Sequence, residues 1–134
     1  MDTIANMFAM IMTGMERKKE TVDVPHSREK ENIAAILARN GFIGAQEVVA
    51  RGSKKVLRLK LRYKKDKFGH MSKGIISKIK RISKPGCRVY AGVDEIPRIM
   101  SGYGTVIMST SRGIISGEEA SQQKVGGEVI AYVW

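Results

Sequence analysis

Apolar residues repeat every three or four positions in two early segments, which predicts two amphipathic helices. The first segment runs from Ile4 to Met15, and its spacing follows the 3.6-residue period of an α-helix. The second follows Ser27, a residue suited to cap a helix N-terminus, and stops at the Asn-Gly pair of residues 40–41, which favours a helix end. Between these helices, Thr21 to Val24 has the composition of a short strand that ends at Pro25.

The pattern then changes to a period of two, which is typical of strands. The segment from Val56 to Lys64 alternates apolar residues with four cations, which are Arg58, Lys60, Arg62 and Lys64. We also expect strands over Ile43–Ala50 and Gly74–Ser83, with a hairpin loop over Lys65–Lys73 around Gly69. Four like charges on one strand face repel one another, so an anionic partner is one interpretation and a solvated sheet face is the other.

A break at residues 84–86, Lys-Pro-Gly, separates this part from the rest of the chain. After this break we expect a strand at Arg88–Ala91, a turn or short helix at Asp94–Ile99 and a buried strand at Thr105–Met108. A short helix should then start with the capping-box pair Ser116 and Glu119 and end at Gly126 and Gly127. The last expected element is a strand at Glu128–Trp134. The sequence therefore predicts an α+β protein with an N-terminal domain over residues 1–84 and a C-terminal domain over residues 85–134, mostly β with one short helix.

The net charge of +11 is concentrated in one part of the 134-residue chain. Residues 51–90 contain fifteen Lys or Arg and a single acid, Asp66, which gives +14, whereas residues 1–50 give −1 and residues 91–134 give −2. A local positive field of this size attracts polyanions such as nucleic acid, an anionic membrane or an acidic protein.

Several function classes find no support in the sequence. We expect no enzyme, because the chain contains no phosphate-binding loop and no nucleophile elbow. We expect no metal or other cofactor, because Cys87, His26 and His70 lack the close spacing of a metal site. We expect no membrane partner, because the apolar segment from Ile4 to Met15 is too short to span a bilayer and lacks the positive flank of a secretory signal.

The segment Ser109, Thr110, Ser111, Arg112 and Gly113 is the best candidate for a binding site. Three hydroxyl side chains follow a strongly apolar strand, and each of them can both donate and accept a hydrogen bond. This chemistry suits base edges, ribose 2′-hydroxyls and phosphate oxygens, to which Arg112 adds a charge-assisted contact. The alternative is a hydroxyl-rich turn that satisfies its own backbone.

The same segment also carries a resemblance to a known family, the bacterial and plastid ribosomal small-subunit protein eight. The other residues that carry the resemblance are Gly126-Gly127-Glu128 with the end Val129-Ile130-Ala131-Tyr132-Val133-Trp134, Ser83-Lys84-Pro85-Gly86 with Arg88-Val89-Tyr90, Ile96-Pro97-Arg98-Ile99-Met100, and the spacing of the opening residues. The resemblance runs from end to end without a large gap, and it is most specific in the C-terminal part.

The resemblance implies two small α/β domains in tight contact and a primary binder of ribosomal RNA that supports assembly in the central domain of the small subunit. It implies neighbouring ribosomal proteins as partners, a place in the cytoplasmic or an organellar ribosome, and a capacity in some members to repress their own operon through a similar mRNA site. The RNA-binding residues that it implies are Lys84, Arg88, Tyr90, residues 109–113, Gly126, Gly127 and Glu128.

Two of these residues and one segment leave alternatives open. Glu128 either accepts a hydrogen bond from a base amino group or orients residues 109–113, which we call the hydroxyl segment. Tyr90 either stacks on a base or packs against the protein. Met10, Met12 and Thr13 replace the arginines and asparagine that the family usually carries in the first helix. A non-ribosomal binder of structured RNA, DNA or acidic partners is the competing hypothesis, because it rests on the same basic segment.

Overall fold

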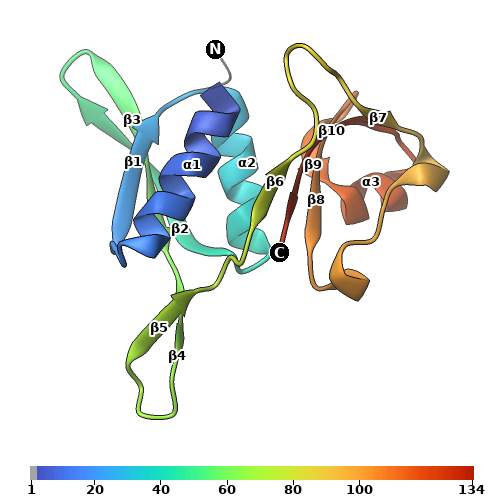
Figure 1. The fold of residues 1–134 in the computed structure, drawn as a ribbon. Helices are drawn as coiled ribbons and strands as arrows, with labels where there is room; N and C mark the ends of the chain where they lie inside the picture. The colour runs from blue at the N-terminus through green and yellow to red at the C-terminus, as the bar shows by residue number, and fades with distance from the viewer. Residues whose placement is uncertain (1–2) are drawn as a thin grey trace. The chain divides into compact units, whose positions relative to one another are not determined.

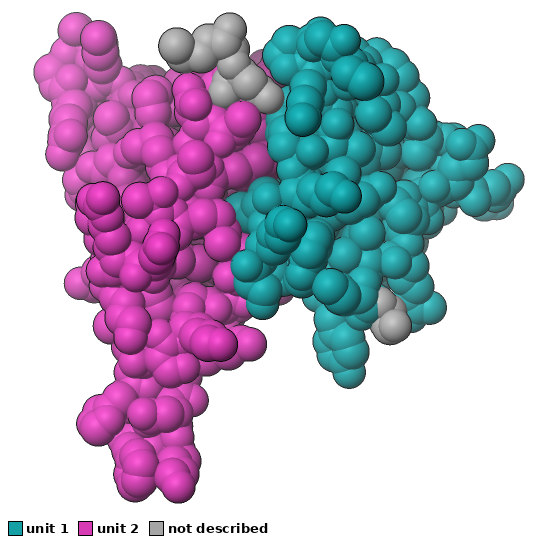
Figure 2. Space-filling model, in the orientation of Figure 1, with its two compact units in different colours: residues 1–2, 77–134 teal, residues 3–76 magenta. Residues whose placement is uncertain are grey.

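A computed structural model describes residues 3–134, except for the side chain of Ser101. The chain folds as two compact units, which Figure 2 colours separately: an N-terminal unit of residues 3–76 and a C-terminal unit whose described residues are 77–134. The division falls between Ile76 and Ser77, whereas the sequence suggested the Lys84–Pro85 bond. Residues 79–81 belong to the C-terminal unit because they form strand β6 (Ile79–Arg81), which pairs with the last strand of the chain.

Two helices and a three-stranded antiparallel sheet form the main body of the N-terminal unit (Figure 1). Helix α1 spans Thr3–Glu16 and helix α2 spans Arg28–Arg39, as the apolar spacing predicted. The Ser27 hydroxyl accepts a hydrogen bond from the Lys30 N–H at 3.2 Å, and Gly41 takes φ +78° after the last turn of α2. The predicted cap and stop signals of α2 are therefore confirmed.

The strand order in this sheet is β1 (Thr21–Pro25), β3 (Lys54–Leu61), β2 (Ile43–Arg51). Leu57, Leu59 and Leu61 of the central strand are buried, together with Val22 and Val24 of β1. The alternation that the sequence predicted for β3 is thus present, with one apolar face buried in the unit.

The predicted strands on either side of the hairpin are each shorter than expected. Strand β3 ends at Leu61, and Tyr63–Lys65 forms a separate strand, β4, which pairs with β5 (Met71–Gly74). The prediction of one strand over Gly74–Ser83 is therefore wrong. The chain leaves β5, donates a hydrogen bond from Ile75 N–H to the Arg62 carbonyl at 3.0 Å, and then crosses to the other unit, where β6 begins.

The C-terminal unit contains a sheet of order β6, β10 (Gly127–Val133), β8 (Thr105–Thr110), β9 (Gly113–Ser116), and the short strand β7 (Tyr90–Ala91) also pairs with β10. A 3-10 turn at Val93–Glu95 lies where a turn or short helix was expected near Asp94–Ile99, and a second 3-10 turn follows at Met100–Gly102. Helix α3 spans Gly117–Gln123 and is capped by the Ser116 hydroxyl, which accepts from Glu119 N–H. It ends at Lys124, which takes φ +57°, and not at Gly126 and Gly127.

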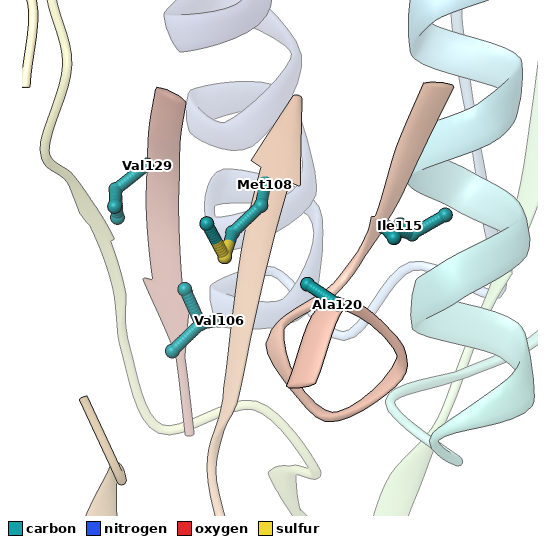
Figure 3. Close-up of a cluster of buried hydrophobic side chains, with 5 residues drawn as sticks. All are labelled: Val106, Met108, Ile115, Ala120 and Val129. Atoms are coloured by element: carbon teal, nitrogen blue, oxygen red, sulfur yellow. The ribbon is translucent and has the colours of Figure 1, made fainter. Parts of the chain in front are cut away.

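The core of this unit lies between the sheet and α3. Val106, Met108, Ile115, Ala120 and Val129 form a buried cluster, contributed by β8, β9, α3 and β10 (Figure 3). Met108 pairs directly with Val129 on one side and with Ile115 on the other, so these three side chains share the sheet face that packs on α3. Among the helices of residues 3–134, none has the length and apolar composition needed to cross a membrane.

Candidate nucleic-acid interface

The residues predicted to bind RNA meet where three strands of the C-terminal unit run side by side. Glu128 of β10 pairs with Tyr90 of β7 on one side and with Ser109 of β8 on the other. Directly paired residues in a sheet project to the same face. Tyr90, Glu128 and Ser109, which we call the Glu128 face, therefore lie on the sheet face opposite to the Met108 core cluster.

Gly126 and Gly127 let these strands approach one another. A Cβ atom on Gly127 would lie 2.2 Å from the Ser109 carbonyl oxygen, and one on Gly126 would lie 2.6 Å from the Ala91 carbonyl oxygen. Both distances are far below any van der Waals contact, and the neighbouring atoms belong to the backbone. The two glycines are thus needed to bring Tyr90 and Ser109 to either side of Glu128, which is a structural reason for their place in the site.

The carboxylate of Glu128 is fixed by two side chains. Its Oε2 accepts a hydrogen bond from the Ser83 hydroxyl at 2.7 Å and another from Arg88 Nη1 at 3.0 Å. Ser83 is fully buried, and its hydroxyl oxygen also accepts from Val89 N–H at 3.2 Å. This network ties the segment that leads from β6 into β7 onto β10, and it sets where Arg88 and Tyr90 stand.

The contacts of Glu128 show which segment its carboxylate orients. Within residues 3–134, the Glu128 carboxylate makes no hydrogen bond to the hydroxyls of residues 109–111, so it organises the 83–90 segment and not the hydroxyl segment. Its Oε1 has no hydrogen-bond partner in the same described part of the chain. With 19% of the side chain exposed, Oε1 is free to accept a hydrogen bond from a ligand.

The hydroxyl segment is a tight β-hairpin turn and not a longer loop. Ser109 and Thr110 end strand β8, Gly113 begins strand β9 with φ +97°, and Ser111 and Arg112 lie between the two strands. The Thr110 hydroxyl donates to the Gly113 carbonyl at 2.9 Å and accepts from Arg112 N–H at 3.1 Å. The Thr110 hydroxyl therefore satisfies the backbone of its own turn, which is one of the two interpretations of this segment. One lone pair of its oxygen remains available to accept a hydrogen bond from a ligand.

The other polar groups of the turn are available to a ligand. Ser111 and Arg112 are exposed and Ser109 is half-buried, and none of their side chains makes a hydrogen bond among the described residues. On the far side of Glu128, Tyr90 is 68% exposed and Lys84 is exposed in the tight turn that the Lys84–Cys87 bridge closes. Donors, acceptors, an aromatic ring and cations thus surround the Glu128 face.

The four cations expected on one face of the predicted strand are not equivalent in the structure. Arg58 donates to both carboxylate oxygens of Asp23, at 2.8 and 3.1 Å, and this hydrogen bonding holds the pKa of Asp23 below its usual range. Arg62 donates to the Gly41 carbonyl at 2.7 Å. Lys60 and Lys64 have no such partner within residues 3–134, so of the four cations only Arg58 is neutralised by a carboxylate.

Ser83 is the residue of this site whose role could not be predicted from the sequence. It stood in the segment that carries the family resemblance, but nothing in its neighbours indicated a buried hydroxyl. Its importance depends on Glu128, which lies 45 positions later in the chain. Within residues 3–134 no group of three or more His, Cys, Asp or Glu side chains could hold a metal ion.

Comparison with known proteins places this arrangement in a family. The profile of the family described as Ribosomal protein S8 matches residues 2–134. The small ribosomal subunit protein uS8 of Alkaliphilus oremlandii is 48% identical over 99% of this chain and 97% of its own length. The proteins of the same name from Clostridioides difficile and Mycoplasmopsis pulmonis are 43% and 44% identical over 99% of this chain and cover 97% and 96% of their own lengths. These relatives are small ribosomal subunit proteins, and the chain belongs to the ribosomal protein S8 family, as the resemblance of its sequence indicated.

Proposed function

We propose that this protein is a constituent of the small ribosomal subunit and that it binds a folded helix of the central domain of small-subunit rRNA. The observation that carries this proposal is the Glu128 face, where strand pairing sets Tyr90 and Ser109 on either side of a fixed carboxylate. The names of the relatives, each a small ribosomal subunit protein, support the place in the ribosome.

The Glu128 face offers chemistry that suits non-duplex RNA. Ser109, Ser111 and the Oε1 atom of Glu128 provide hydrogen-bond donors and acceptors for base edges and 2′-hydroxyl groups, while Tyr90 provides a stacking surface. A carboxylate repels phosphate, so Glu128 would exclude a backbone that crosses the centre of the face and admit a base or a ribose there. We therefore propose that the RNA presents bases and riboses at Glu128.

Cations around this face would hold the flanking phosphates. Lys84 and Arg112 are exposed on either side, and Arg88 retains free donors beyond the one that bonds Glu128. Such contacts add affinity that depends on salt and little on sequence. Specificity for the RNA site and salt-dependent affinity for its phosphates would then come from different side chains, so mutation can separate the two.

The test is RNA binding by the full chain at several salt concentrations, with a central-domain rRNA fragment and an unrelated RNA duplex. Ser109→Ala with Ser111→Ala should weaken binding of the fragment by on the order of 1–3 kcal/mol, because polar groups of the RNA lose their partners. The salt dependence should barely change. Lys84→Gln should instead lower the slope of log affinity against log salt by about 1.

Ser121→Ala is the matched control, because Ser121 is an exposed serine on α3 of the same unit, away from the Glu128 face. Thr110→Val would test the turn itself as well as its surface, since the Thr110 hydroxyl hydrogen-bonds the backbone of Arg112 and Gly113. Equal affinity of the double serine variant and the wild type for the fragment would refute the assignment of this face.

The same face would also recognise an mRNA segment that folds like the rRNA site. We include repression of its own operon, and contact with neighbouring small-subunit proteins, in the proposal. A reporter fused to the operon leader would show the repression, and the double serine variant should relieve it. If the protein instead binds duplex DNA or acidic polymers as tightly as the rRNA fragment, a general polyanion binder is the better description.

A further inference from the structure

The β4–β5 hairpin is a part of the N-terminal unit that the proposed function does not use. Its two strands form a sheet of their own, separate from the β1–β3–β2 sheet. Figure 1 shows the hairpin as a finger that projects away from the helices and the main sheet of its unit. Every residue from Lys64 to Met71 is exposed.

The base of this finger is anchored to the N-terminal unit. The Tyr63 hydroxyl donates to the Gly14 carbonyl in the last turn of α1 at 3.3 Å and to the Lys19 carbonyl, just beyond the end of that helix. Gly74 packs so closely on Met15 that a Cβ atom there would lie 2.7 Å from the sulfur. The hairpin is therefore held at its base while its tip remains in solvent.

The tip is built around one carboxylate. Asp66 Oδ1 accepts from Phe68 N–H at 2.8 Å and from His70 N–H at 2.9 Å, and Asp66 N–H donates to the His70 carbonyl at 2.9 Å. Gly69 takes φ +82° to complete the turn. The single acid of the hairpin is thus used by the turn itself, and a preformed tip spends little conformational entropy when it binds.

This tip presents an aromatic ring among lysines. Phe68 is 73% exposed, and Met71, three positions later in the chain, is 52% exposed. The ammonium group of Lys67 lies 5.2 Å from the centroid of the Phe68 ring. Lys64, Lys65 and Lys73 follow on the arms, and none of the four lysines has an acidic partner within the described chain.

We propose that the β4–β5 hairpin is a second RNA contact, in which Phe68 stacks on an unpaired base and the surrounding lysines hold the adjacent phosphates. An exposed aromatic ring beside a row of cations is the arrangement that proteins use for single-stranded nucleic acid. The inference extends the proposed function and rests on it for the source of the RNA, but it concerns other residues in the other unit.

An acidic protein segment is the alternative occupant, and the aromatic ring argues against it. Lysines alone would serve a carboxylate-rich partner, and such a partner gains little from a bare ring that carries a negative face. A nucleotide uses both features at once, since each base has a π-face and each linkage carries a phosphate. The charge and the ring together therefore favour RNA.

The experiment measures binding of the full chain to a single-stranded oligouridylate of about ten nucleotides, a length within the range of known single-strand sites. Phe68→Ala should weaken binding on the order of ten-fold, the loss expected when one base no longer stacks. Phe68→Leu should lose as much, although it keeps an apolar side chain, and Phe68→Tyr should retain binding. Replacement of Lys64 and Lys65 by Gln should lower the salt slope by about 0.7 for each lysine.

Tyr103→Ala is the matched control, because Tyr103 is 89% exposed in the C-terminal unit and lies outside the lysine cluster. It should bind the oligouridylate like the wild type. Unchanged binding by both Phe68→Ala and Phe68→Leu would overturn the inference, and so would an oligoglutamate that competes equally well with the oligouridylate.

The central-domain rRNA fragment separates this inference from the proposed function. Dependence of fragment binding on Ser109 and Ser111, with no effect of Phe68 on the oligouridylate, would leave the proposed function standing and refute the hairpin contact. The opposite pattern, in which oligouridylate binding depends on Phe68 but the fragment is not preferred over a duplex, would support the hairpin contact and refute the role of the Glu128 face.

Discussion

The Ser83–Glu128 hydrogen bond should be one of the most stabilising polar contacts of the C-terminal unit. Ser83 is fully buried, and its hydroxyl donates to a carboxylate at 2.7 Å while it accepts from Val89 N–H. A hydrogen bond to a charged group contributes about 1.5–3 kcal/mol, and a buried donor left without an acceptor adds to the loss. Ser83→Ala should therefore destabilise the unit by about 2–3 kcal/mol.

Two further variants separate the contributions of the Glu128 charge and of Arg88 to this stability. Glu128→Gln keeps the shape of the side chain but removes its charge, so it should cost about 1–2 kcal/mol. Arg88→Gln should cost less than about 1 kcal/mol, because half of the Arg88 side chain is exposed and exposed ion pairs contribute little. In a double-mutant cycle, Ser83→Ala and Glu128→Gln should show a coupling free energy of about 1 kcal/mol or more.

Urea denaturation followed by tryptophan fluorescence measures these values. Trp134 is the single tryptophan of the chain and belongs to the C-terminal unit, where its backbone N–H donates to the Lys78 carbonyl at 3.0 Å. With a denaturant slope of about 2 kcal/mol/M, the Ser83→Ala midpoint should fall by about 1 M. The reasoning would be refuted if the Ser83→Ala midpoint shifted by less than about 0.2 M on the same slope. It would also be refuted if the free-energy changes of Ser83→Ala and Glu128→Gln added up to that of the double variant.

Three other perturbations follow from single contacts. Gly127→Ala would place a methyl group against the Ser109 carbonyl, so the C-terminal unit should lose about 2 kcal/mol or more in urea denaturation, and specific RNA binding should weaken with it. Hydrogen bonding to Arg58 lowers the pKa of Asp23 in the folded state, so the ionised Asp23 stabilises the fold at pH values above the usual pKa near 3.8. This stabilisation is lost as the pH falls through the lower folded pKa. Asp23→Asn should therefore reduce the loss of stability measured by acid titration below about pH 4. Tyr63→Phe removes the donor to two backbone carbonyls, which should cost about 1 kcal/mol and raise amide hydrogen exchange in the β4–β5 hairpin.

Short-range patterns were sufficient to predict the local elements of this chain. The Ser27 cap, the apolar stripe of α2 and the alternation along β3 each depend on residues within a few positions, and the structure confirms them. The capping pair Ser116 and Glu119 likewise predicted the start of α3. Such signals are local because backbone hydrogen bonds in a helix and side-chain alternation in a strand are set by near neighbours.

Predictions that required long-range pairing were less accurate. The segment over Gly74–Ser83 has the composition of one strand, but its first residue pairs with Tyr63 and its later residues pair with β10, so it divides between two sheets. Gly126 and Gly127 were expected to end a helix, whereas close approach of two neighbouring backbones requires them. No pattern within the segment itself distinguishes these cases.

The sequence alone determined the fold class, the family resemblance and the residue types that a nucleic-acid interface needs, because these depend on composition and on local order along the chain. Only the tertiary structure decided how those residues are used. Thr110 bonds its own turn, Asp23 pairs with Arg58, and Ser83 fixes Glu128. Since the last two contacts join residues 35 and 45 positions apart, strand pairing alone determines which charges are paired and which remain free for a ligand.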